Sequence, residues 1–238
     1  MNSPLAPDNS AFESLNVPDL VGLVEIQLTR AIVEGRLAPG SRIVEAEIAR
    51  RMGVSRAPVR EAARRLERQG VLVARPRHGF IVRPITVQEI DDLFQVRISL
   101  EETAIELACE KADAAGLQRL QALVEAMVRD APMQPQHQRI ASDLAFHTLI
   151  CELSGNAHLH RIFSNIQTEM CMIIALIDAV YDDPAAIAAT HNPIINALLQ
   201  RDVTAARAAM RLHLVDAWHH VRALFLKKHG VSQPPSLA

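Results

Sequence analysis

The chain has 238 residues, of which 49% are apolar and 22% charged, so it is long enough for two domains and too apolar to be disordered throughout. Aromatic residues make up only 3%, a bias that favours helices over sheets. The net charge of −2 conceals an uneven distribution: residues 21–85 hold 13 basic against 6 acidic side chains, and the remainder is acidic. We therefore expect a polyanionic partner for the first part only.

The order of residues favours neither a membrane-spanning nor a secreted protein. The longest apolar stretch, Met170–Val180, is too short to cross a bilayer and contains Asp178. The first residues lack the basic and apolar segments of a signal peptide. Cys109, Cys151 and Cys171 have no paired spacing and are typical of buried thiols in a reducing compartment. We expect a cytoplasmic protein with no membrane partner.

The basic part of the chain has the element order of a winged helix-turn-helix. Apolar spacing predicts three helices followed by two short strands on either side of a basic Pro-Arg-His-Gly tip. Gly53 can supply the positive φ that the tight turn between the second and third helices requires. The predicted helices cover residues 19–34, 45–52 and 55–69, and the predicted strands cover 71–73 and 80–82.

The third of these helices has the side chains that reading a DNA duplex requires. Ser55 begins the helix, where a side-chain oxygen and free backbone amides can meet a phosphate. Arg56 and Arg60 are four residues apart, so they project from one face, and arginine is suited to bidentate pairing with guanine. His78 and Gly79 at the tip allow a close approach to a groove. The alternative is that these arginines only solvate a helix face.

From Thr86 onward the pattern is helical throughout. A capping box formed by Thr86 and Glu89 opens the first helix, and Asp113 caps the second. The lengths and short connections predict an antiparallel helical bundle. Its predicted helices cover residues 86–111, 113–130, a segment ending at 155, 157–180, 184–200 and 202–228.

The chain is thus expected to be mainly α, with a winged helix-turn-helix before an all-α bundle. The expected domains are a flexible tail over 1–18, a DNA-binding domain over 19–84, an effector-binding and dimerisation domain over 85–228 and a second tail over 229–238.

Four residues of the bundle are candidate metal ligands. Asp143 and His147 are at i and i+4 on one helix face, while His191 and His213 lie in later helices. Three imidazoles and one carboxylate from three helices could enclose a divalent metal with positions left for water or a ligand. From the spacing alone, hydrogen-bonded core histidines remain the alternative.

Residues 54–62, 70–73 and 78–82 together resemble the winged-helix domain of GntR-type bacterial regulators. Some members of that family place an arginine in the second helix for base contact, whereas this chain has Ala46 between Glu45 and Glu47. The resemblance covers about residues 20–83 and implies DNA contact by Ser55, Arg56, Arg60, His78 and Gly79.

The bundle resembles the FCD effector domain of the FadR subfamily over about residues 86–225. The resemblance implies a bound divalent metal, which we expect to be zinc, with nickel, cobalt, manganese and copper as alternatives. Pro193 cannot donate its amide, so we expect a kink that shifts His191. His219 and His220 fall outside the pattern and are expected at the surface. The implied metal ligands are Asp143, His147, His191 and His213.

Arg97 resembles the arginine that faces the effector pocket in that family. A second cation beside a metal favours a small carboxylate, which can chelate the ion and pair with the guanidinium. The alternative is that Arg97 only forms a salt bridge with Glu101, one helical turn away.

These observations predict a metabolite-responsive transcriptional regulator and not an enzyme. We expect a homodimer on a palindromic operator with a small organic acid as effector, and the resemblance favours repression. Two alternatives remain: a helical metal-dependent enzyme with an appended basic module, and an architectural DNA binder that ignores sequence. The operator, the effector and the native metal are not specified by the sequence.

Overall fold

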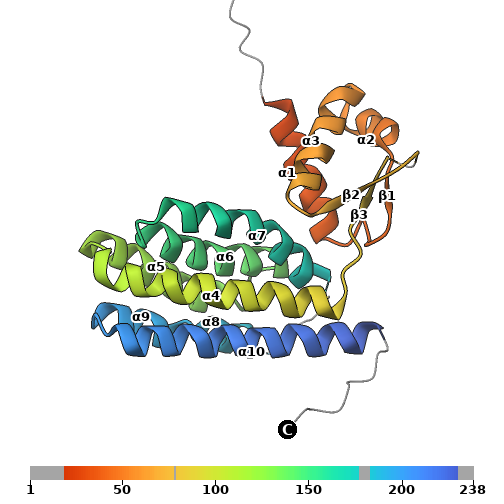
Figure 1. The fold of residues 1–238 in the computed structure, drawn as a ribbon. Coiled ribbons are helices and arrows are strands. Elements are labelled where there is room, and N and C mark those ends of the chain that lie inside the picture. Colours follow the sequence, from red (N-terminus) through yellow and green to blue (C-terminus); the bar gives the residue numbers. More distant parts are fainter. Residues whose placement is uncertain (1–18, 78, 177–182, 230–238) are drawn as a thin grey trace, which may run out of the picture.

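The computed structural model describes residues 19–77, 79–176 and 183–229. Figure 1 shows two parts: a small domain of short helices and strands, and a larger bundle of long helices. The prediction of a winged helix-turn-helix followed by a helical bundle is confirmed. Among the described residues, no helix is both long enough and apolar enough to span a membrane.

The small domain contains three helices and a three-stranded antiparallel sheet. The wing was predicted as two strands, and the structure adds a third: Arg42 pairs with Ile81, and Ile43 with Phe80. A two-residue strand is too short for a sequence pattern, so only its pairing reveals it. The elements are α1 (Leu20–Val33), β1 (Arg42–Ile43), α2 (Glu45–Met52), α3 (Arg56–Arg68), β2 (Leu72–Arg75) and β3 (Gly79–Val82).

The turn between α2 and α3 is held by local chemistry and by burial. Gly53 ends α2 with φ 67°, a left-handed conformation that glycine adopts without a Cβ penalty. Val59, Ala63 and Leu66 of α3 are fully buried in the core of the small domain. The inward face of α3 is therefore fixed, and its other face remains exposed to solvent.

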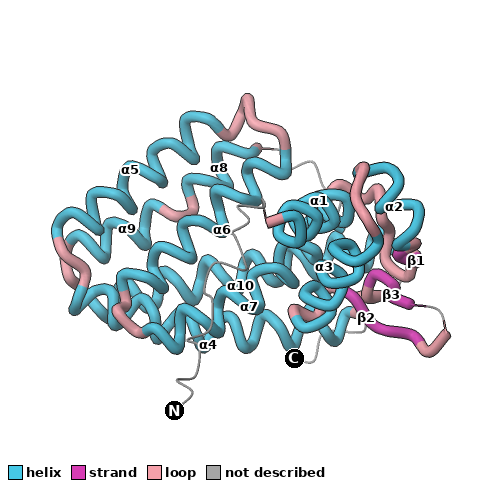
Figure 2. Tube along the Cα trace, turned by 90° about the horizontal axis from the view of Figure 1, so that it is seen from above, coloured by secondary structure: helices cyan, strands magenta, loops and turns pink. Residues whose placement is uncertain are grey.

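The bundle helices begin where the caps predicted. Thr86 and Glu89 form the reciprocal capping box at the start of α4, and the Asp113 carboxylate accepts a hydrogen bond from the Gly116 amide. Figure 2 shows the same helices from above, with the β2–β3 wing projecting away from the bundle. The elements are α4 (Val87–Lys111), α5 (Ala114–Asp130), α6 (Gln136–Leu153), α7 (Ala157–Leu176), α8 (Pro184–Ala189), α9 (Asn192–Leu199) and α10 (Val203–His229).

The single helix predicted over 184–200 is wrong, because the structure has two helices there. The first ends at Ala189, and His191 is the N-cap of the second. Pro193 lies in the first turn of that second helix, where the absence of its amide hydrogen costs nothing. The proline thus marks a helix start, and the break places His191 in a connection where its ring can turn inward.

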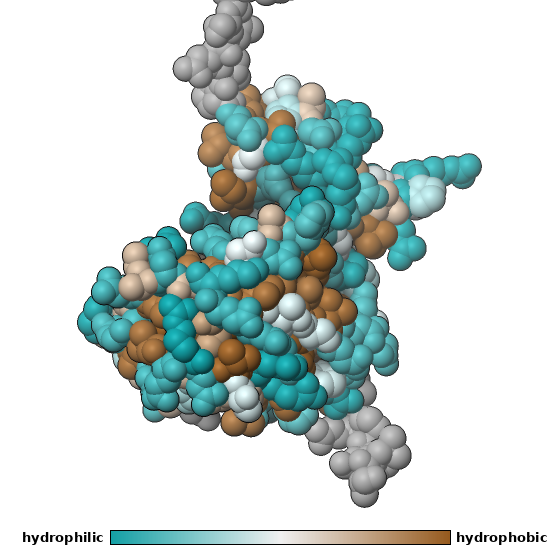
Figure 3. Space-filling model, turned by 60° about the vertical axis from the view of Figure 1, so that its left-hand side comes forward, coloured by the Kyte–Doolittle hydropathy of each residue, from teal (hydrophilic) through white to brown (hydrophobic). Residues whose placement is uncertain are grey.

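Helix α7 joins the two parts of the molecule. Its Met172 side chain is 1% exposed and belongs to the core of the small domain, whereas Met170 and Ile173 belong to a core cluster of the bundle. Nearby, Nη2 of Arg83, just after β3, lies 2.6 Å from a carboxylate oxygen of Glu169. In Figure 3 the visible surface is largely hydrophilic, with smaller hydrophobic patches on both the small domain and the bundle. The contacts of α7 couple the small domain to the bundle.

Candidate metal centre and nucleic-acid interface

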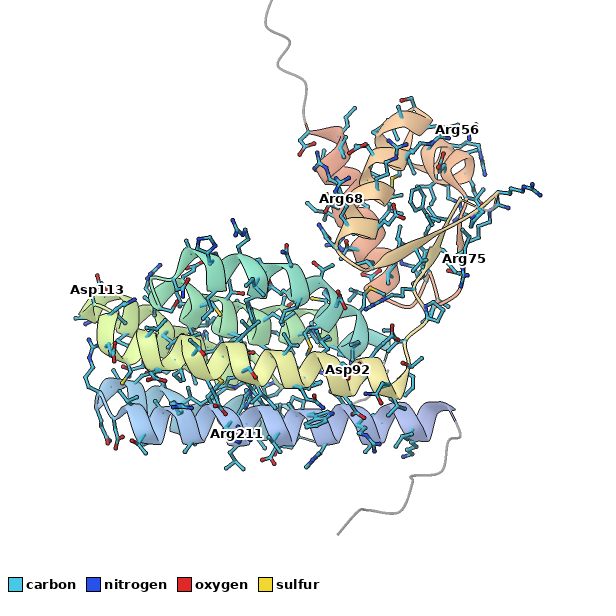
Figure 4. All side chains as sticks on the ribbon, in the orientation of Figure 1. Arg56, Arg68, Arg75, Asp92, Asp113 and Arg211 are labelled. Carbon is cyan, nitrogen blue, oxygen red and sulfur yellow. The ribbon has the colours of Figure 1, made fainter. Side chains whose placement is uncertain are left out.

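The start of α3 presents polar and cationic side chains to solvent. Ser55 is the N-cap with an extended backbone, and its side chain makes no capping hydrogen bond, so the hydroxyl can meet a ligand. Arg56 and Arg60 follow on the exposed face, with side chains 63% and 51% exposed. Figure 4 shows Arg56 at the end of the small domain that is remote from the bundle. This arrangement offers donors to a phosphate and to base edges together.

A carboxylate from the neighbouring helix contacts both arginines. Glu45 in the first turn of α2 accepts hydrogen bonds from Nε of Arg60 at 3.1 Å and from Nη2 at 2.8 Å. Nη2 of Arg56 lies 3.6 Å from the same carboxylate. The pKa of Glu45 is below its ordinary value, chiefly because of the hydrogen bond from Arg60, so it is an anion. Glu45 belongs to no motif of the sequence that would have predicted this contact.

The wing supplies the remaining predicted contacts. Gly79 has φ 74° and an open space where a Cβ would lie, so a close approach of another molecule is possible there. Arg75 and Arg77 are exposed beside it, and Arg77 itself has φ 64°. Figure 4 places Arg75 on the strand that leads to the tip. The predicted contact at His78 lies outside the described residues.

The four candidate metal ligands converge in the bundle, although they come from distant parts of the chain. Asp143 and His147 lie on α6, His191 lies between α8 and α9, and His213 lies on α10. One ligand atom from each residue can be chosen so that all four atoms lie within 4.8 Å of one another. Helix α10 and the two short helices α8 and α9 pack against the central helices of the bundle, and this packing brings the four residues together.

Each of the three histidines uses its Nδ1 atom for a hydrogen bond to the protein. Nδ1 of His147 contacts the buried carboxylate of Glu101, and Nδ1 of His191 lies 3.0 Å from the carbonyl oxygen of Ala188. Nδ1 of His213 lies 3.0 Å from the Thr190 hydroxyl, which donates its own hydrogen to a backbone carbonyl. All three acceptors require a proton on Nδ1, which leaves a lone pair on each Nε2 atom.

These Nε2 lone pairs face one another and the Asp143 carboxylate. Nε2 of His191 lies 3.2 Å from Asp143 and has no hydrogen bond among the described residues. Nε2 of His147 lies 3.8 Å from Asp143 and 3.3 Å from Nε2 of His213. Lone pairs at such distances repel unless a cation lies between them, whether a proton in acid or a metal ion. The donor set therefore fits a divalent metal held by three imidazoles and one carboxylate.

The protonation states of the site agree with this fit. Burial lowers the pKa of His147 and of His213, so both rings are neutral near pH 7. Burial alone would raise the pKa of Asp143, but the neighbouring His191, His147 and Arg97 keep it well below its ordinary value. The site thus presents two neutral imidazoles, those of His147 and His213, and an ionised carboxylate, the forms that metal ions bind.

Arg97 and Glu101 form a buried ion pair next to the candidate ligands. The side chains are 2% and 0% exposed, and Nε of Arg97 donates to the Glu101 carboxylate. Nη2 of Arg97 is also buried but has no hydrogen-bond partner among the described residues. Arg97 can therefore form the salt bridge with Glu101 and contact an effector at the same time, because Nε holds Glu101 while Nη2 can donate to a ligand.

A cavity of about 250 Å³ opens beside these residues. Its apolar walls include Phe94, Ile140 and Val221. His220, expected only at the surface, is an exposed residue that nevertheless lines this cavity, because the same face of α10 carries His213 and Asp216. Thr190 and Arg139 also line the cavity, and neither was predicted, because neither belongs to a sequence motif. The polar side chains that line the cavity include Arg97, Arg139, Asp143, Thr190, His191 and His213.

Comparison with known families matches both parts of the chain. Residues 21–82 match the family described as "Bacterial regulatory proteins, gntR family", and residues 92–216 match the FCD domain. The second match alone covers more than half of the chain.

Named relatives are similar over most of their length. A Paenarthrobacter nicotinovorans protein described as "Probable D-xylose utilization operon transcriptional repressor" is 31% identical over 77% of this chain and 80% of its own. The Bacillus subtilis (strain 168) regulator YdhC, of HTH type, is 29% identical over 82% of this chain and 88% of its own. Both are described as transcriptional regulators.

Solved structures have the same fold. The structure of E. coli McbR/YncC aligns with a TM-score of 0.76 at 23% identity, covering 88% of this chain and all of that one. A GntR regulator from Rhodococcus sp. RHA1 aligns with a TM-score of 0.74 at 21% identity, covering 87% of this chain and 99% of that one.

Proposed function

Because the chain belongs to the gntR family of bacterial regulatory proteins and carries an FCD domain, it is a DNA-binding transcriptional regulator. We propose that it is a repressor whose affinity for a palindromic operator changes when a small organic acid binds beside a metal ion in the bundle. The observation that carries this proposal is the convergence of three Nε2 lone pairs and one carboxylate next to an Arg97 donor that has no partner within the described part of the chain.

The DNA contacts are assigned to α3 and the wing. Four of the proposed contact residues, Ser55, Arg56, Arg60 and Gly79, are exposed, and α3 holds its cations on the face opposite the buried side chains. A recognition helix enters the major groove with the residues near its N-terminus on base edges. The proposed contacts are Ser55, Arg56, Arg60, His78 and Gly79.

The proposed metal ligands are Asp143, His147, His191 and His213. Such an ion would supply Lewis acidity and open positions for an oxygen ligand. We expect zinc, with nickel, cobalt and manganese as alternatives. The protein's own contribution is orientation: Glu101, the Ala188 carbonyl and Thr190 hold the three rings with their Nε2 atoms inward.

Charge balance favours a carboxylate guest. The charges of Arg97 and Glu101 cancel, and an imidazole that binds a metal ion is neutral, so Asp143 is the only anionic ligand of the proposed set. A divalent ion bound by these ligands therefore keeps a single positive charge, which a carboxylate neutralises. Nη2 of Arg97, to which no described residue hydrogen-bonds, can donate to such a guest, while Phe94, Ile140 and Val221 accommodate an apolar body.

Communication between effector and DNA is assigned to α7. Phe94, Ile140 and Val221 line the cavity and share a core cluster with Met170 and Ile173 of α7, while Met172 reaches the small domain. An effector that binds one arrangement of these helices more tightly would shift the position of the small domain. Repression is supported by the described role of the Paenarthrobacter relative.

A homodimer is proposed because two-fold proteins bind half-sites about one helical turn apart on a palindromic operator. Sedimentation of the full chain with and without a selected duplex measures the number of copies, and a single copy on DNA would contradict the homodimer.

The named relatives are regulators, which favours a sensor over the alternative of a metal-dependent enzyme.

A thermal-shift screen tests the proposed site. We expect zinc to raise the melting temperature of the full chain, and a small carboxylate to raise it further only when zinc is present. Both shifts should be lost in His147→Ala, and the carboxylate shift alone in Arg97→Ala. His219→Ala is the control, since His219 is exposed and lies outside the cavity. A carboxylate shift that survives both variants contradicts chelation.

A further inference from the structure

An acidic side chain lies between the two arginines that are assigned to DNA. Glu45 is only 13% exposed and accepts from Arg60 through two donors, Nε at 3.2 and 3.1 Å from the two carboxylate oxygens and Nη2 at 2.8 Å from one of them. It lies 15 residues before Arg60 and belongs to a different helix. An acidic residue at the DNA-facing end of a basic domain repels phosphate, so its position there requires a reason.

The edge of the guanidinium that Glu45 contacts supplies that reason. Arginine has five N–H donors in a planar group with two usable edges. Glu45 engages the edge formed by Nε and Nη2. The outer edge, formed by Nη1 and the second hydrogen of Nη2, points away from Glu45. This outer edge has the two parallel donors that match O6 and N7 of guanine.

We propose that Glu45 is a positioning residue that holds Arg60 with its outer edge directed at a guanine, and so determines base specificity. This inference rests on the proposed contact between Arg60 and DNA. Holding a long side chain before binding reduces the rotamer entropy lost on binding. The carboxylate also opposes the binding of unspecific phosphate by the same arginine. Both effects increase the difference between operator and unrelated DNA.

The same helix offers a matched control. Glu47 lies two residues further along α2 and pairs with Arg51, and both side chains are well exposed. Glu47→Gln and Glu45→Gln therefore remove the same charge from the same helix. Only Glu45→Gln disturbs Arg60, so a difference between the two variants isolates positioning from net charge.

The experiment selects duplexes from a random library with the full-length wild type and with Arg60→Ala, Glu45→Gln, Glu45→Ala and Glu47→Gln. Fluorescence anisotropy at one salt concentration then gives the affinity of each protein for the duplex selected by the wild type and for a shuffled duplex. Thermal melting by circular dichroism checks that each variant is folded.

We expect the ratio of selected to shuffled affinity to fall about tenfold in both Glu45 variants and to stay within about twofold in Glu47→Gln. The Glu45 variants should lose base preference at the same positions as Arg60→Ala. The inference is overturned if Glu45→Gln behaves like Glu47→Gln, or if it loses preference at other positions. If Arg60→Ala selects the same sequence as the wild type, the proposed base contact itself fails and the inference falls with it.

Discussion

At the scale of single residues, the bundle site is organised by acceptors behind the candidate ligands. Glu101 is fully buried and contacts both Nε of Arg97 and Nδ1 of His147. Burial raises the pKa of its carboxyl, but Arg97 and His147 lower this pKa by a larger amount. The pKa of Glu101 is therefore below its ordinary value. Glu101 is thus an anion that orients one candidate metal ligand and one candidate effector contact.

Replacement of Glu101 tests this orientation. We expect Glu101→Gln to weaken zinc binding about 10- to 100-fold, because it replaces the anionic acceptor that fixes the His147 ring with a neutral amide. Competition with a chromogenic chelator measures the affinity. Glu102→Gln is the matched control, since the neighbouring Glu102 pairs with Arg207 and Arg211 at the surface of the bundle. Equal zinc affinity of Glu101→Gln and the wild type would show that the ring needs no such support.

At the scale of elements, breaks in helices are as informative as the helices themselves. The α8–α9 break turns His191 toward Asp143, and Pro193 begins the helix that follows. Helix α7 has a different role, because one short stretch of it packs against both the small domain and the bundle. The coupling between the two parts therefore depends on a few side chains.

Met172 is one of the residues of α7 that carry this coupling, through its packing in the core of the small domain. We expect Met172→Ala to lower the free energy of unfolding by about 2–5 kcal/mol, since it removes a fully buried side chain from the core of the small domain. Chemical denaturation followed by circular dichroism measures it. Met133→Ala should change stability by less than about 0.5 kcal/mol, because Met133 is 89% exposed. Similar losses in both variants would contradict the assigned packing.

At the scale of the whole molecule, stability depends on pH through the same buried site. His147 and His213 have a pKa below the ordinary value in the folded protein, while their unfolded pKa stays near 6.5. The unfolded chain therefore binds more protons below about pH 6.5, and the folded state loses stability as the pH falls. Glu101 acts in the same direction at still lower pH, because its folded pKa is also lowered.

We therefore expect the metal-free protein to melt at a lower temperature at pH 5.5 than at pH 7.5. The double variant His147→Gln, His213→Gln should show a smaller difference between the two pH values, because it removes both depressed imidazoles. Differential scanning calorimetry in the presence of a chelator measures both proteins. A wild-type melting temperature that is constant over this range would contradict the assigned burial of the two rings.

Local patterns were sufficient for much of the fold. The caps at Thr86 and Asp113 predicted the starts of α4 and α5, and the spacing of α2 and α3 predicted the helix-turn-helix. Such signals succeed because caps and periodicity act within one or two helical turns. The hydrophobic pattern did not predict β1, because a strand of two residues is defined only by its pairing with the distant β3. It also did not predict the break between α8 and α9, where Pro193 lies at a helix start.

The sequence by itself determined the class of the protein, the cationic face of α3 and the identity of the four candidate ligands. Only the tertiary structure decided that Asp143, His147, His191 and His213 meet, that Glu101 lies behind His147, and that Glu45 contacts Arg60. The physical reason is that a side chain's chemistry is fixed by its own residue, whereas its orientation, burial and ionisation are fixed by partners that folding brings from other helices.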